Sequence, residues 1–159
     1  MTAASWSEDL ALDNPRMDTT HEEFLVLLES LRDAGEDERL ARLDDLIGHT
    51  EAHFGQEDRW MRATGFAPGS CHETQHAQVL AVLRDQAGRA RRGEAVDFSR
   101  LAQELGIWFA HHVQTMDAAL AFHCSQVGFD TSTESIDPQR ARAALPEQPL
   151  THCGGTACS

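Results

Sequence analysis

Two long stretches without proline most strongly constrain how this chain can fold. No proline occurs between Pro15 and Pro68 or between Pro68 and Pro138, so no helix is interrupted there by a missing backbone donor. Apolar residues recur within these stretches at steps of three and four, which is the period of an amphipathic helix. Strict apolar/polar alternation with β-branched residues, the pattern of a strand, does not stand out. The sequence therefore predicts an all-α protein.

The apolar pattern delimits four helical segments joined by short connections. Asp18 can cap the first segment, and Gly65 follows the second where a C-terminal cap belongs. Ser70 opens a Ser-x-x-Glu capping box at the start of the third, and Asp97 precedes the fourth. The helices are expected at about residues 18–35, 38–64, 70–92 and 98–124. Four such helices favour an up-down-up-down four-helix bundle.

The end of the chain differs from the bundle in composition. After Phe129 there is no aromatic residue, and three of the five prolines lie there. Such a segment buries little apolar surface, so we expect a flexible, mostly disordered tail at 130–159. The four-helix bundle then covers residues 1–129, of which 1–17 form a short N-terminal arm. The four cysteines are expected to be reduced; Cys153 and Cys158 in the tail are either loose thiols or a redox-sensitive or metal-acquiring pair.

The charge balance excludes several classes of function. Acidic residues outnumber basic ones 26 to 13, which gives a net charge of −13 and disfavours binding to nucleic acid or to an anionic membrane. No apolar run reaches the roughly 20 residues of a membrane-spanning helix, and the first residues lack the features of a signal peptide. A cytoplasmic location is therefore expected. The chain has no lysine and no tyrosine, which excludes a lysine Schiff base and a tyrosine radical.

Nine histidines are many for 159 residues, and their positions indicate metal chemistry. The pairs His53–Glu57 and His72–His76 are spaced i, i+4, so the members of each pair share one helix face. That face is the apolar one, where an unsatisfied polar group costs about 1–3 kcal/mol. All four helices carry such residues: His21; His53 and Glu57; His72 and His76; His112 and Asp117. Five imidazoles and two carboxylates are too many for one zinc ion and suit two ions of iron, manganese or zinc bridged by the carboxylates.

The segments around these residues resemble the bacterial hemerythrins, a family with a hemerythrin-like HHE cation-binding domain. The resemblance runs from Trp6 to His123, about three quarters of the chain. Four segments carry it: Met17–His21, His53–Met61, His72–His76 and Trp108–Asp117. It implies a hemerythrin-like bundle that holds two iron ions and binds dioxygen reversibly.

The resemblance also implies a role for each candidate ligand. His72, His76 and His112 would hold one iron. His21 and His53 would hold the other, which keeps an open coordination position for dioxygen. Glu57 and Asp117 would bridge the irons together with an oxide or hydroxide. The expected function is storage, delivery or sensing of oxygen by a monomer, rather than catalysis.

Several alternatives stay open from the sequence. The same centre would also suit an enzyme that reduces peroxide or nitric oxide, a sensory module, or an iron-handling protein. His49 stands one turn before His53 and is either a residue behind the ligands or a surface histidine, and His111 competes with His112 for the ligand position. Glu73 and His76 match one Glu-x-x-His element of ferritin-like oxidases, which need two, so Glu73 is assigned to the capping box.

The spacing of the last two candidate ligands predicts a local distortion. His112 and Asp117 are five residues apart, which is about 140° around a regular α-helix. A side chain at that angle does not face the same metal as His112. We therefore predict an irregularity, such as a π-bulge, between Phe109 and Asp117.

Overall fold

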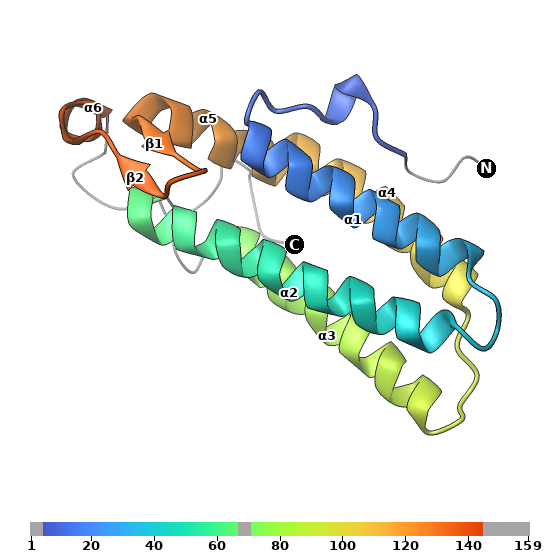
Figure 1. Ribbon diagram of the computed structural model, residues 1–159. Coiled ribbons are helices and arrows are strands. Elements are labelled where there is room, and N and C mark those ends of the chain that lie inside the picture. The colour runs from blue at the N-terminus through green and yellow to red at the C-terminus, as the bar shows by residue number, and fades with distance from the viewer. Residues whose placement is uncertain (1–4, 67–70, 145–159) are drawn as a thin grey trace.

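The computed structural model describes residues 5–66 and 71–144, and its main body is a bundle of four antiparallel helices (Figure 1). The helices are α1 (Pro15–Asp33), α2 (Arg39–Thr64), α3 (Cys71–Arg91) and α4 (Phe98–His112); α5 (Ala118–Val127) continues α4 beyond a π-helical turn at Val113–Asp117. A 3-10 helix, Glu8–Leu10, precedes α1. Helix α1 packs against α2 and α4, and α2 packs against α3. The predicted all-α, up-down-up-down four-helix bundle is confirmed.

The start of α1 is set by a proline and an asparagine. Asn14 is the N-cap, and its side chain accepts a hydrogen bond from the Met17 N–H, while Pro15 takes the first helical position, which its fixed φ suits. Asp18, expected to be the cap, lies inside the first turn and accepts hydrogen bonds from the N–H groups of Leu12 and Asn14. Helix α1 therefore begins at Pro15 rather than near Asp18.

The predicted cap at Gly65 is confirmed, and Asp97 is a cap at the predicted start of α4. Gly65 follows α2 with φ 67°, in the left-handed region where a residue without a side chain is least strained. The side chain of Asp97 accepts a hydrogen bond from the Arg100 N–H at the start of α4. These caps fix where α2 ends and α4 begins.

Two apolar clusters fill the bundle, one on each side of a buried polar layer. The larger cluster includes Phe24 and the smaller one includes Met17; along α1, the buried His21 lies between these two residues. The same order recurs along α2 and along α4 and α5, where buried polar residues separate members of the two clusters. The polar layer is therefore closed at both ends by apolar side chains.

Residues 128–144 form secondary structure beside α5. Gly128, with φ 66°, ends α5. Strand β1 (Phe129–Asp130) pairs antiparallel with β2 (Ser135–Ile136), and α6 (Pro138–Ala144) follows and contacts α5 (Figure 1). The side chain of Phe129 is buried in the smaller cluster, and the Asp137 carboxylate accepts hydrogen bonds from two N–H groups at the start of α6.

The segment predicted as a tail, residues 130–159, thus begins with a hairpin and a helix in its described part. The physical reason is a few specific contacts: Phe129 is buried in the smaller cluster, Arg140 donates to the Ser125 carbonyl of α5, and Glu134 accepts hydrogen bonds from α2. Residues 145–159, with Cys153 and Cys158, lie outside the described residues. Within the described ranges, none of the helices combines the length and apolarity that crossing a bilayer requires.

Candidate metal centre

Seven polar side chains from all four helices of the bundle converge in the buried layer. Each of them is at most 2% exposed. They are His21 from α1, His53 and Glu57 from α2, His72 and His76 from α3, His112 from the end of α4, and Asp117 from the π-helical turn. The structure thus brings together all seven residues that were predicted from the sequence as metal ligands.

The seven side chains form two groups that share two carboxylates. The three-histidine group contains His72, His76, His112, Glu57 and Asp117, and the two-histidine group contains His21, His53 and the same two carboxylates. Within each group, one nitrogen or oxygen atom of every residue lies within 4.8 Å of the others. Each group is therefore compact enough to surround one cation.

Glu57 turns one carboxylate oxygen toward each group. Its Oε1 lies 2.8 Å from His53 Nε2 and 3.5 Å from His21 Nε2. Its Oε2 lies 3.3 Å from His76 Nε2 and 3.4 Å from His72 Nε2. This is the arrangement of a carboxylate that can bridge two cations.

Asp117 repeats this pattern because of the π-helical turn. Its Oδ2 lies 3.1 Å from His21 Nε2, whereas its Oδ1 lies 2.9 Å from His72 Nε2 and 3.1 Å from His112 Nε2. In a regular helix, the spacing of five residues would turn Asp117 about 140° away from His112. The wider turn at Val113–Asp117 returns it to the same face. The irregularity predicted before Asp117 is confirmed.

Several buried polar atoms of this layer lack a hydrogen bond. Within the described residues, no hydrogen bond reaches Glu57 Oε2, either carboxylate oxygen of Asp117, or either ring nitrogen of His21. An unsatisfied buried polar atom costs about 1–3 kcal/mol, so the protein alone does not account for these atoms. A cation in each group would satisfy the carboxylate oxygens and an imidazole nitrogen. Imidazole and carboxylate together form a donor set that iron, zinc and manganese accept.

The charges in the layer hold its carboxylates ionised. Burial opposes ionisation of Glu57, but the imidazoles, His53 foremost, hold the pKa of this carboxyl well below its ordinary value. Burial and the Glu57 charge oppose ionisation of Asp117, but His112 and His21 also lower its pKa well below the ordinary value. Burial lowers the pKa of His21, and Asp117 and Glu57 outweigh it and raise that pKa to about 9. A cation bound by His21 would therefore displace a proton from this imidazole.

Two side chains behind the three-histidine group orient its imidazoles. His76 Nδ1 donates to Asp58 Oδ1 at 3.0 Å, and His112 Nδ1 donates to Gln75 Oε1 at 2.8 Å. Because Nδ1 of each ring makes a hydrogen bond on the side away from the two groups, Nε2 faces the shared carboxylates. Sequence reasoning missed Asp58 and Gln75, because both contacts join different helices and depend on how those helices are rotated against each other.

Replacing Asp58 by asparagine is expected to lower metal affinity roughly 10- to 100-fold. The amide keeps the size of the side chain but removes the negative charge next to His76 Nδ1. Competition with a chelator measures the affinity. Asp44→Asn is the matched control, because Asp44 also lies on α2 and pairs with Arg91 at the surface. An unchanged affinity in the Asp58 variant, or an equal loss in both variants, contradicts this role.

The aromatic surroundings of the two groups differ. Phe54 stacks on the His76 ring of the three-histidine group at a centroid distance of 3.9 Å. Beside the two-histidine group, Phe24 and Phe109 stack on each other at 4.3 Å, and Phe109 meets the His21 ring edge-on at 5.4 Å. The two-histidine group, which has one imidazole fewer, therefore lies against an apolar wall formed by Phe24 and Phe109.

Within residues 5–66 and 71–144, three further histidines lie outside both groups. His49 Nε2 donates to the backbone carbonyl of Thr20 at 3.2 Å, and His123 Nε2 donates to that of Thr64 at 3.0 Å. His111 is exposed. These histidines bond to the backbone or face solvent, so His112 rather than His111 joins the buried layer.

Glu73 and Cys71 lie near the start of α3, outside the two groups. Glu73 forms an ion pair with Arg62 at 2.7 Å; its expected capping partner Ser70 lies outside the described residues. Cys71 is disulfide-bonded, which corrects the expectation of reduced thiols at this position. Cys124 is free and buried, and burial raises the pKa of its thiol to about 12, which makes it an unreactive thiol.

A compact, buried cluster of imidazoles and carboxylates within four antiparallel helices defines a candidate cation-binding bundle. A family model described as the hemerythrin HHE cation binding domain matches residues 13–121. A bacteriohemerythrin of Ralstonia nicotianae is 39% identical over 135 residues, which cover 85% of this chain and 98% of that protein. The chain belongs to the hemerythrin family, as the sequence segments indicated.

More distant relatives agree with this assignment. A bacteriohemerythrin of Pseudomonas aeruginosa is 24% identical over 71% of this chain and 76% of its own length. One from Stenotrophomonas maltophilia is 23% identical over 76% of this chain and 81% of its own length. No solved structure matches the chain with significant similarity.

Proposed function

We propose that the two groups bind two iron ions and that the protein binds dioxygen reversibly, for storage, delivery or sensing. Under this proposal, His72, His76 and His112 hold one iron, and His21 and His53 hold the other. Glu57 and Asp117 bridge the irons together with an oxide or hydroxide. The observation that carries the proposal is that each shared carboxylate directs one oxygen toward each group.

The donor set supports iron in its ordinary oxidation states. Seven ligands supply only two negative charges, fewer than a carboxylate-rich site would supply, so they stabilise high-valent iron poorly. When bound, two iron ions can each exchange one electron with dioxygen, which is the chemistry that reversible binding requires. The chain contains no tyrosine that could store a radical. These features favour oxygen binding over oxidative catalysis.

The two-histidine group supports a site for a small apolar ligand. It has one imidazole fewer than the other group, and Phe24 and Phe109 lie against its imidazoles. Apolar rings exclude water and supply no proton. Such a wall favours the release of dioxygen unchanged over its reduction.

Dioxygen is the ligand in this proposal, and the chain acts as a cytoplasmic monomer. A net charge of −13 supports the exclusion of nucleic acid and of anionic membranes as partners, because both repel an acidic surface.

The visible spectrum of the iron-loaded protein tests the proposal when the sample is cycled between air and nitrogen. We expect an absorption band that appears under air and disappears under nitrogen in repeated cycles. Protein loaded with zinc is the control, because zinc does not change its oxidation state. An irreversible change in the first cycle contradicts the proposal, and so does iron-dependent turnover of peroxide or nitric oxide, which would favour an enzyme.

A further inference from the structure

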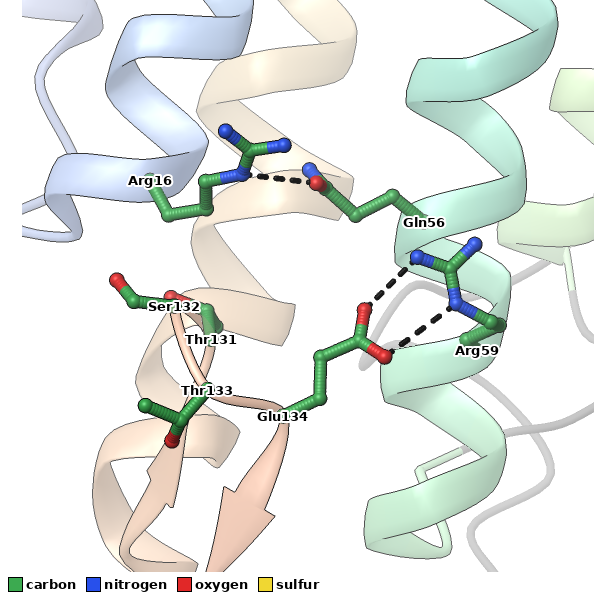
Figure 2. Close-up of a pocket in the computed structure, with 7 residues that line it drawn as sticks. All are labelled: Arg16, Gln56, Arg59, Thr131, Ser132, Thr133 and Glu134. Atoms are coloured by element: carbon green, nitrogen blue, oxygen red, sulfur yellow. Dashed lines mark hydrogen bonds and ion pairs between the residues drawn. The ribbon is translucent and has the colours of Figure 1, made fainter.

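A surface pocket of about 520 Å³ lies between α1, α2 and the loop that joins β1 to β2 (Figure 2). Arg16 comes from the first turn of α1, and Gln56 and Arg59 come from α2. The four loop residues 131–134 complete the lining. The volume is in the range of about 300–1,000 Å³ that is typical of small-molecule sites.

The residues that line the pocket carry a net positive charge, because two arginines face a single carboxylate. Arg59 forms an ion pair with Glu134 at 2.8 Å, and the indole N–H of Trp60 donates to the same carboxylate at 3.1 Å (Figure 2). Arg16 instead donates its Nε–H to the neutral Gln56 Oε1 at 3.0 Å, and no ion pair joins it to an acid of the described residues. An arginine without an ion pair to a described acid is unexpected in a chain with a net charge of −13.

Arg16 is held in place from the protein side. Gln56 is 7% exposed, and its Nε2 donates to Thr20 Oγ1 at 3.4 Å, while that hydroxyl donates to the Arg16 carbonyl at 2.9 Å. The guanidinium uses only Nε in this network, so both terminal nitrogens are left without a partner within residues 5–66 and 71–144. A fixed guanidinium with two parallel N–H groups matches two oxygens of a phosphate.

We propose that this pocket binds a small phosphate-class oxyanion, either free phosphate or a small phosphomonoester, through Arg16 and the Ser132 hydroxyl. Ser132 is an exposed residue of the loop, and its hydroxyl has no partner within the part of the chain that the structure describes. Gln56 precedes Glu57 and Thr20 precedes His21. The bound anion therefore lies beside the segments of α1 and α2 that carry the two-histidine group.

Isothermal titration calorimetry of the metal-loaded, full-length chain with sodium phosphate tests this site, at an ionic strength held constant with sodium chloride. We expect one saturable site per chain. Arg16→Gln is expected to weaken binding roughly tenfold or more, the effect of losing a charge-assisted hydrogen bond. Glu134→Gln is expected to tighten binding severalfold, because it removes the only negative charge among the residues that line the pocket.

Arg32→Gln is the matched control, because Arg32 also lies on α1 and is exposed outside the pocket, where it pairs with Asp33. It is expected to bind phosphate within about twofold of the wild type. Absence of saturable binding overturns the proposal. So does unchanged binding in the Arg16 variant, which would place phosphate at the metal centre, or equal weakening in both arginine variants, which would reflect net charge alone.

A parallel titration with glycerol phosphate distinguishes the two sources of the anion. Tighter binding than that of free phosphate supports the site and identifies a phosphomonoester as its ligand, because the ester fills more of the pocket. Equal or weaker binding, with the same dependence on Arg16, supports the site and identifies free phosphate.

Discussion

Replacing Asp117 by alanine is expected to remove nearly all bound metal from the protein. Asp117 belongs to both groups, with Oδ2 facing His21 and Oδ1 facing His72 and His112. Its loss leaves each group one ligand short and removes one of the two carboxylates that face the buried imidazoles. Elemental analysis after gel filtration measures the metal that each chain retains, and we expect a fall from about two ions to almost none.

Two matched comparisons make this result specific. Asp85→Ala removes an exposed aspartate from α3, outside both groups, and should leave metal content unchanged. His112→Ala should lose metal, whereas His111→Ala, at the exposed neighbouring residue, should keep it. Circular dichroism checks that each variant retains its helices. Wild-type metal content in the Asp117 variant, or equal losses at His111 and His112, would falsify the assignment of these ligands.

Replacing Phe109 by alanine is expected to lower the free energy of unfolding of the metal-free protein by about 3–5 kcal/mol. Phe109 is fully buried, stacks on Phe24 at 4.3 Å and meets the His21 ring edge-on. The cavity would remove these contacts and open the apolar wall beside the two-histidine group. The loss is a large part of the 5–15 kcal/mol that stabilises a typical domain. Urea unfolding measures the change.

Phe122→Ala is the matched control, because it makes the same substitution in α5, the helix that continues α4, at a side chain that is 67% exposed. We expect its free energy of unfolding to stay within about 0.5 kcal/mol of the wild type. In the iron-loaded protein, Phe109→Ala should also shorten the time for which oxygen binding survives under air, because water can reach the site. A loss below about 1 kcal/mol in the Phe109 variant contradicts the role of this ring in the core.

The helices and the seven buried polar residues were predictable because helical periodicity is a local property. His53 and Glu57 are four residues apart on an apolar face, and so are His72 and His76, so burial of that face carries them inward. The five-residue spacing before Asp117 was also informative, because a regular helix cannot place that carboxylate beside His112. The π-helical turn follows from the same arithmetic.

Other features depend on contacts that the sequence pattern does not contain. The bonds from Asp58 to His76 and from Gln75 to His112 are set by the rotation of one helix against another. The hairpin after α5 depends on the burial of Phe129 and on hydrogen bonds that join Thr131 and Glu134 to the N-cap of α1 and to α2. The composition of this segment otherwise suggests a tail. Neither signal stands out in a single sequence.

Anaerobic titration of the metal-free protein with iron(II) tests most directly whether two cations share the carboxylates of this bundle. Because Glu57 and Asp117 each face both groups, we expect a breakpoint at about two iron ions per chain. The iron-loaded wild type should then show both ions in magnetic interaction, since they share ligands. A breakpoint at one ion per chain, or two ions that behave independently, would contradict a shared centre.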